Sequence, residues 1–180
     1  MTLIIIIVIV VLLLLFIMTN YNSLVKLREM VKNSMANIAA QVESRWDAVS
    51  SLIEATKKYS EHEASLLRDI TEKRTNIDRD ASARDVERDD DAFSKALTRI
   101  NAVAEAYPDL KASEVYKSTM NSINSYEENV RMSRMIYNDT VTKLNTKIQS
   151  FPSNIVASMF GFKQEEYFKN SSGKTDMPSW

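Results

Sequence analysis

The chain has 180 residues, a formal net charge of −1 from 23 basic and 24 acidic side chains, no cysteine and one histidine. One domain is expected at this length, and the balanced charge argues against binding to nucleic acid, which calls for a basic surplus. Without cysteine no disulfide or thiol nucleophile can form, and one histidine excludes a site of several imidazoles within a chain, so we expect no metal and no cofactor.

Residues 3–18 form the uninterrupted apolar run LIIIIVIVVLLLLFIM. As a helix this run is about 24 Å long, slightly less than the hydrocarbon core of about 30 Å. A secretory signal peptide is the alternative, but no charged segment precedes the run and no small-residue cleavage site follows it. We therefore predict an uncleaved membrane anchor over residues 1–20. Lys26, Arg28 and Lys32 follow the run, so the positive-inside rule favours an N-terminus outside and a body in the cytoplasm.

A long helix is predicted to follow the anchor without a break, because residues 1–107 contain neither proline nor glycine. Its apolar seam advances by threes and fours and continues, more weakly, to Ile77. The sequence from Ser60 to Glu63 matches the capping box that starts a helix. The helix either continues through Ser60, which we favour, or a second helix begins there. The seam residues are Leu24, Leu27, Val31, Met35, Ile38, Val42, Arg45 or Trp46, Val49, Leu52, Thr56 and Tyr59.

Residues 79–91, RDASARDVERDDD, carry nine charges and a single large apolar residue. No apolar stripe passes through them, so we predict a turn or a frayed segment. Asp91 could then cap the next helix, which Pro108 ends. The apolar face of that helix is Phe93, Leu97, Ile100, Ala104 and Tyr107.

Ser113 is predicted to cap the last long helix, and Pro152 ends it near Ser150. A short helix capped by Ser153 or Asn154 follows, with Ile155, Val156, Met159 and Phe160 on one face, and Gly161 permits a turn at positive φ. A polar tail, residues 169–180, completes the chain. The stripe of the long helix is Ile123, Tyr126, Val130, Arg134, Tyr137, Val141, Leu144 and Ile148.

Helices with one apolar stripe bury it against each other, and short connections make neighbours antiparallel. The predicted fold is all-α: an elongated antiparallel bundle of three to four long helices over residues 21–168, with the first helix continuous with the transmembrane anchor. The number of passes decides where the aromatic block near residue 160 lies. Three passes place it at the end far from the membrane or against another subunit, and four place it at the membrane surface.

No residues indicate catalysis. His62 lies between Glu61 and Glu63, but consecutive residues of a helix point about 100° apart and do not converge. The acidic run Asp89–Asp91 is interpreted as a helix N-terminus favoured by the helix dipole, because calcium loops need spaced ligands and a glycine turn. Two glycines cannot form a glycine-rich phosphate loop. We predict that the protein is not an enzyme.

Polar residues occupy positions in the apolar seams. Arg45 and Arg134 either extend to the surface from buried stems or pair with carboxylates of a neighbouring helix and set its register. Asn138 and Asn145 are seven residues apart and share a helix face, which suits the same kind of pairing.

Four blocks resemble the LemA family in order. They are YNSLVKLREMVKNSMANIAAQVESRWDAV from residue 21, YSEHE from residue 59, AVAEAYPDLKAS from residue 102 and YNDTVTKLNTKIQSFPSNIVASMFGFKQEEYF from residue 137. Departures are Met35, where the family commonly has tryptophan, and Ser50, in a segment where it has proline. The resemblance implies a membrane-anchored bacterial helical bundle without established enzymatic activity. One branch of the family is associated with magnetosome gene clusters.

The leading hypothesis is therefore a structural or scaffolding protein that self-assembles through helical faces and organises or shapes membrane. Its expected partners are the lipid bilayer, further copies of the chain and another membrane protein. The alternative is a membrane-tethered binding or sensor module for a protein or peptide. The candidate contact residues are Tyr21, Asn22, Leu24, Tyr137, Asn138, Asn145, Phe151, Phe160, Phe162, Tyr167 and Phe168.

Overall fold

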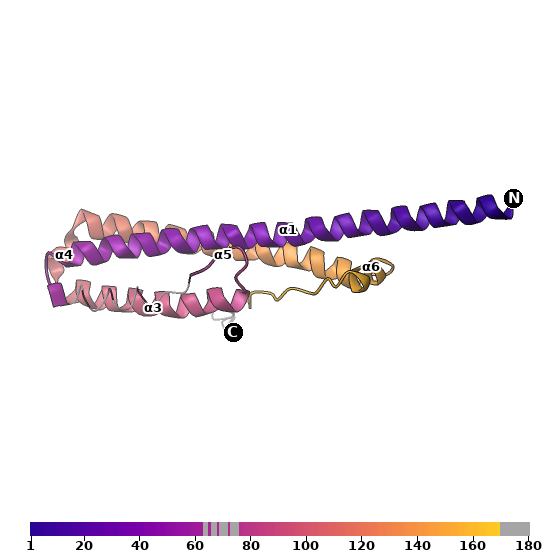
Figure 1. The fold of residues 1–180 in the computed structure, drawn as a ribbon. Helices are drawn as coiled ribbons and strands as arrows, with labels where there is room; N and C mark the ends of the chain where they lie inside the picture. The colour runs from indigo at the N-terminus through magenta and orange to yellow at the C-terminus, as the bar shows by residue number, and fades with distance from the viewer. Residues whose placement is uncertain (63–64, 66–67, 69–71, 73–75, 170–180) are drawn as a thin grey trace, which may run out of the picture.

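The computed structural model describes residues 1–62, 65, 68, 72 and 76–169. Within these residues the chain is all-α and contains no strand, as predicted. Figure 1 shows an elongated molecule in which the long helices lie along one axis, and the first of them projects past the others at its N-terminal end.

Helix α1 runs as one unit from Thr2 to Thr56, so the apolar segment and the body share a helix, as predicted. Its first part is long and apolar enough to cross a membrane, and its side chains up to Leu15 are exposed. From Leu24 onward the predicted seam faces the core: apart from the half-buried Leu27, every seam residue from Leu24 to Thr56 is buried.

The favoured prediction of a helix continuing through Ser60 is wrong. α1 ends at Thr56, whose carbonyl accepts the backbone N–H groups of Tyr59 and Ser60 and closes a turn. Ion pairs Lys32–Asp80 and Arg79–Glu29 then place residues 79–80 beside the membrane-proximal part of α1. The chain therefore returns along the bundle between Thr56 and Asp80. Most of the weaker seam from Glu63 to Lys73 lies outside the described residues.

Helix α3 spans Ala83–Ala106, so the prediction of a turn through residue 91 and a cap at Asp91 is wrong. A capping box with Ser82 as N-cap starts this helix nine residues earlier. The Ser82 hydroxyl accepts the Asp85 backbone N–H, and the Asp85 carboxylate accepts the Ser82 backbone N–H. The charged run is helical because its acidic residues have partners inside the bundle, described below.

Helix α5, Glu114–Gln149, forms the main seam of the molecule with α1. Ser113 caps it by accepting the Tyr116 backbone N–H, as predicted. The short α4, Pro108–Ala112, joins it to α3. The predicted stripe of α5 faces the core, and its buried members are Ile123, Val130, Tyr137, Val141 and Leu144.

Helix α6, Ser153–Met159, follows Pro152. Ser153 is its first residue rather than its cap, and the Ser153 hydroxyl donates to the Lys147 and Ser150 carbonyls. Gly161 takes the predicted positive φ, at 70°. Of the four predicted apolar positions only Val156 is buried, while Ile155, Met159 and Phe160 are exposed.

The aromatic block lies beside the end of the apolar segment of α1, where the Tyr21 and Phe160 ring centroids are 4.7 Å apart. The chain thus makes four passes along the bundle: α1 outward, the segment to Asp80 back, α3 outward and α5 back (Figure 1). The favoured expectation of a distal block is wrong, because the turn after Thr56 adds the fourth pass.

The capping box predicts that Ser82 contributes to the stability of α3 and that Asp91 does not. Ser82→Ala removes an N-cap and is expected to lower the free energy of unfolding by about 1 kcal/mol, measured by urea titration of the detergent-solubilised protein. Hydrogen bonds from Ser82 lower the pKa of Asp85. The contribution of the box is therefore complete above the ordinary aspartate pKa and is lost as the pH falls through the lowered value. Asp91→Ala is the control; an equal loss in that variant would contradict the assigned start of α3.

Candidate functional site: an ion cluster, an asparagine clamp and an aromatic end

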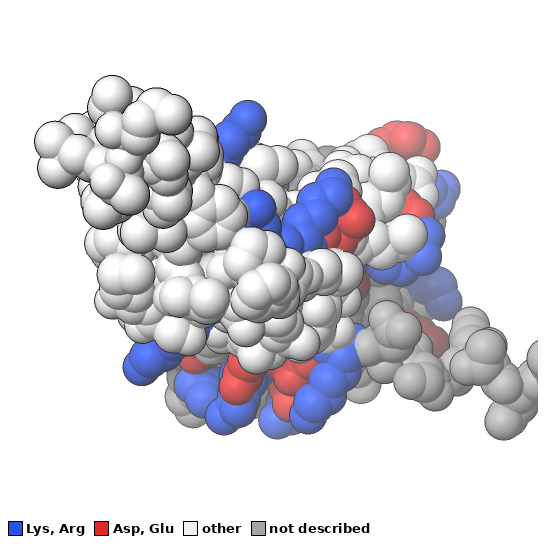
Figure 2. All heavy atoms as spheres, turned by 90° about the vertical axis from the view of Figure 1, so that its right-hand side faces the viewer, with Lys and Arg blue, Asp and Glu red and all other residues white. Residues whose placement is uncertain are grey.

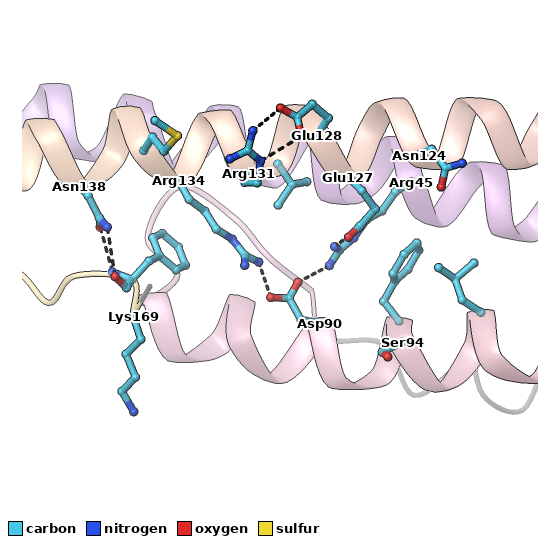
Figure 3. Close-up of a pocket in the computed structure, with 15 residues that line it drawn as sticks. Arg45, Asp90, Ser94, Asn124, Glu127, Glu128, Arg131, Arg134, Asn138 and Lys169 are labelled. Atoms are coloured by element: carbon cyan, nitrogen blue, oxygen red, sulfur yellow. Dashed lines mark hydrogen bonds and ion pairs between the residues drawn. The ribbon is translucent and has the colours of Figure 1, made fainter. Parts of the chain in front are cut away.

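A buried ion cluster joins three helices at the middle of the bundle (Figure 3). Arg45 of α1 is 1% exposed, and its Nη2 donates to Asp89 Oδ2 and Asp90 Oδ1 of α3, both at 2.8 Å. Its Nη1 donates to Glu127 Oε1 of α5 at 2.6 Å. Arg134 of α5 donates to the other oxygen of Asp90. The two basic and three acidic side chains therefore connect α3 to both α1 and α5.

Aromatic contacts complete the cluster. The Trp46 indole Nε1 donates to both carboxylate oxygens of Asp89, at 3.0 and 3.1 Å. The Arg45 guanidinium carbon lies 4.3 Å from the Phe93 ring centroid, and the Trp46 and Phe93 rings meet edge to face. Burial alone would lower the pKa of Arg45, but Glu127, Asp89 and Asp90 outweigh it and raise that pKa. Arg45 is thus a permanent cation in the core.

These contacts confirm one of the two interpretations of the seam arginines, the pairing with carboxylates of neighbouring helices. The prediction that Asp89–Asp91 form a helix N-terminus is wrong, because Asp89 and Asp90 lie in the second turn of α3. A signal for this was present. Val86, Asp89 or Asp90, and Phe93 follow one another at helical spacing, so the apolar face of α3 extends back through the acidic run.

An asparagine clamp holds residues 162–169, which we call the C-terminal strap, against α5. Asn145 Nδ2 donates to the Glu165 carbonyl and its Oδ1 accepts the Glu165 backbone N–H, both at 2.9 Å. Asn138 makes the same two bonds with Phe168, at 3.1 and 2.9 Å. The two asparagines do share a face, but their partner is the backbone of the strap and not a carboxylate of another helix.

Phe168 is the apolar anchor of the strap. The Phe168 and Tyr137 ring centroids are 5.0 Å apart. The Arg134 guanidinium carbon lies 5.1 Å from the Phe168 ring centroid. Burial, with Glu165 and Glu166 nearby, raises the pKa of Tyr137 to about 12. The phenol therefore stays neutral at physiological pH, and the strap closes over an uncharged aromatic pair.

A cleft of about 760 Å³ lies between α3 and α5, beyond the end of the strap. Figure 3 shows the ion cluster along it, with Asn138 and Lys169 at one end and Asn124 at the other. Its walls carry Arg131 and Arg134 together with Glu127 and Glu128. The described residues contain no group of three or more side chains arranged to hold a metal ion, and His62 is exposed.

An apolar end surface forms the membrane-proximal end of the body (Figure 2). Phe151 is 81% and Phe160 49% exposed, and Ile155 and Met159 are also exposed. Arg28 lies over the Phe162 ring, 5.2 Å from its centroid. Lys and Arg side chains, interspersed with Asp and Glu, lie around this end in Figure 2.

The predicted contact residues divide into two sets. Four of them, Leu24, Tyr137, Asn145 and Phe168, are buried inside one chain and offer no surface to a partner. Asn138 and Phe162 are half-buried, and Asn138 is occupied by the strap. The remaining five are exposed: Tyr21, Asn22, Phe151, Phe160 and Tyr167.

Removing the central cation should destabilise the bundle strongly. Arg45→Met leaves Asp89 buried without its cation, and we expect the free energy of unfolding to fall by about 3–5 kcal/mol, measured by urea titration. Arg131→Met is the matched control. Arg131 is exposed and, among the described residues, its ion pair is with Glu128 in the preceding turn of its own helix, so that variant should unfold almost as the parent does. Similar unfolding of the two variants would show that the cluster does not hold the helices together.

The chain is similar to several known proteins. The magnetosome proteins MamQ 2 and MamQ 1 of Paramagnetospirillum magneticum (strain ATCC 700264 / AMB-1) are each 36% identical over 80 residues, 44% of this chain and 29% of theirs. The chain thus matches less than a third of their length. Protein LemA of Metamycoplasma hominis is 29% identical over 154 residues, 83% of this chain and 69% of that protein.

The family comparison covers most of the chain. The model of the LemA family matches residues 34–179, which include the ion cluster, the clamp and the aromatic end. The chain therefore belongs to the LemA family.

Proposed function

We propose that this protein is a non-enzymatic structural component of a membrane, attached at two points and assembled from several copies. The first attachment is the apolar N-terminal part of α1. The second is the apolar end surface formed by Phe151, Ile155, Met159 and Phe160. Two attachments hold the body at a defined angle to the bilayer, which a single helix cannot do, and copies held in this way can organise or shape the membrane.

The position of the apolar end surface carries this proposal. Large apolar side chains exposed together mark a surface that is covered by something else. Here they gather beside Tyr21, where α1 emerges from its apolar segment. Aromatic residues favour the bilayer interface, and basic residues favour its anionic surface. Lys26, Arg28 and Lys163 supply the positive charge near this end. Under the positive-inside rule, this charge favours a cytoplasmic body.

A second exposed apolar surface supports self-assembly. Met132, Met135 and Ile136 lie at helical spacing on α5, and all three are more than half exposed. Three such residues on one turn exceed the isolated apolar side chains that are normal on a soluble surface. A contact between α5 helices of two copies would cover them. The relatives named as magnetosome proteins are in keeping with a role in organising a cellular structure.

The alternative function, a membrane-tethered binding module, is favoured by a different observation, the open cleft between α3 and α5. Membrane attachment leaves the cleft open, because the cleft lies away from the membrane-proximal end, whereas an α5 contact over Met135 would reach its wall.

The membrane contact can be tested with single cysteines, since the chain has none of its own. In vesicles with anionic lipid, a nitroxide label at Ile155→Cys should be more accessible to oxygen than to a water-soluble nickel complex, because it lies in the interface. A label at Lys117→Cys, at the far end of the body, should show the reverse. Adding Phe160→Asp should move the Ile155 label toward water. Equal nickel accessibility at the two labelled sites would refute a second attachment.

Self-assembly can be tested separately on α5. The detergent-solubilised protein should change from oligomer to monomer on dilution, and Met132→Asp with Ile136→Asp should favour the monomer at every concentration, because each buried charge opposes the contact. Light scattering measures the mass. Val115→Asp, an isolated exposed position on the same helix, is the control. A wild-type protein that is monomeric at all concentrations would contradict the proposed self-assembly.

A further inference from the structure

The last turn of the apolar run on α1 is partly covered by another part of the chain. Side chains up to Leu15 are exposed, whereas Phe16 and Ile17, both within the run, are half-buried against the core. Asn20, one turn further, is buried. The covered part of α1 therefore begins inside the segment that is long and apolar enough to cross a membrane.

The covering element is α6. α5 runs antiparallel to α1, and the hydroxyl oxygens of Ser34 and Thr140 lie 3.4 Å apart. Counting one residue against one from that pair, α5 ends at Gln149 opposite about residue 25 of α1, which is short of Phe16. α6 contacts α1 beyond that point, and Figure 1 shows it at the end of the bundle that faces the N-terminal part of α1.

Charged side chains are absent from this end of the described chain and resume at one level. Residues 1–25 and residues 148–162 contain no Lys, Arg, Asp or Glu. Lys26 follows the first stretch, and Lys147 and Lys163 flank the second. By the same count along the helices, Lys147 lies within about one residue of the height of Lys26. The uncharged end thus begins at a level marked by lysines, which is the pattern of a protein that enters a bilayer past its headgroups.

α6 is suited to apolar surroundings on both of its sides. Val156 and Ala157 are buried against the bundle, while Ile155 and Met159 are exposed on the outer side. The Ser153 hydroxyl donates to two backbone carbonyls and so requires no water. A helix that is apolar all round is normally covered by other apolar groups. The outer side of α6 therefore calls for an apolar cover.

The depth of α6 follows from the length of the apolar run. A helix that crosses a bilayer needs about 20 apolar residues, and the run over residues 3–18 is about four residues shorter. A hydrocarbon core of ordinary thickness would therefore extend about four residues past Met18. Phe16 and Ile17 lie about 8 Å inside that boundary. Interfacial helices bury their apolar face to a similar depth, about 5–10 Å.

We propose that the apolar end surface is a wedge inserted into one leaflet only, so that the protein prefers membrane that is convex on the side of its body. This inference rests on the membrane attachment proposed above. In the far leaflet the described chain contributes α1 alone, about 10 Å wide, whereas in the near leaflet α6 lies beside it and nearly doubles the cross-section. A cross-section that is wider on the body side fits the loosely packed lipid of a convex surface.

The preference can be measured with the full-length protein in giant vesicles from which a narrow membrane tube is drawn. Lys117→Cys, at the far end of the body, carries an NBD dye, and the chain has no cysteine of its own. Dithionite added outside quenches the dye on outward-facing bodies, so the two orientations are measured separately. Relative to a lipid dye, outward-facing bodies should be enriched in the tube at least about twofold, and inward-facing bodies should be depleted by a similar factor.

Two variants assign the preference to the wedge. Ile155→Asp with Phe160→Asp replaces exposed side chains, so the bundle should stay folded while the charges expel the wedge from the acyl region. The tube-to-vesicle ratio should then fall to about one in both orientations. Val115→Asp changes a similarly exposed apolar residue far from the wedge, and this matched control should keep the wild-type ratio. Circular dichroism checks that each variant remains folded.

Each outcome decides the inference. Enrichment of outward-facing bodies that the double Asp variant loses supports it. Equal ratios in the two orientations, enrichment of inward-facing bodies, or enrichment that the double variant retains overturns it. Sorting that disappears in the Met132→Asp, Ile136→Asp background also overturns it, because the preference would then come from assembly.

The nitroxide measurement at Ile155 separates this inference from the proposed attachment. A label that is accessible to oxygen, in a protein that shows no sorting, leaves the attachment standing and removes the wedge. A label in water removes both.

Discussion

The buried guanidinium of Arg45 is the constraint on which the arrangement of this bundle depends. Apolar stripes hold helices together but allow them to slide and rotate, because dispersion and burial have little direction. A cation with 1% exposure must find its anions at fixed positions. The carboxylates of Asp89, Asp90 and Glu127, on two other helices, are these anions. The Trp46 indole N–H also donates to the Asp89 carboxylate. The register of α3 against α1 and α5 follows from these bonds.

The position of α3 has a consequence for the rest of the molecule. α1 and α5 share a continuous apolar seam, whereas α3 is joined to α5 through ions and the strap. Polar contacts leave space between helices that apolar packing would close, and the cleft lies in that space. The clamp of Asn138 and Asn145 fills its membrane-proximal part with backbone from the C-terminal strap. The ion cluster that fixes the bundle thus also lines the cleft.

Four passes along the axis bring two distant parts of the chain to the same end. The apolar part of α1 leaves the body at Tyr21, and the block around Phe160 returns to it 139 residues later. A fold with three passes would have separated them by the length of the bundle. The apolar end surface and the apolar part of α1 therefore lie side by side at one end of the body, while the exposed apolar turn of α5 lies along its flank. The proposed structural role rests on this geometry.

Periodicity determined much of the fold from sequence alone. The stripes of α1 and α5, the cap at Ser113, the stop at Pro152 and the turn at Gly161 are local or repetitive signals, so they could be read directly. The turn after Thr56 and the partners of Asp89, Asn138 and Asn145 could not, and the helical start at Ser82 left only the spacing of Val86, Asp89 and Phe93 as a signal. An acidic run reads as a solvated segment unless a buried cation faces it, and an asparagine does not show in sequence whether it will bond a side chain or a backbone. Only tertiary structure decides these, because each depends on a partner many residues away whose position the packing of the whole bundle sets.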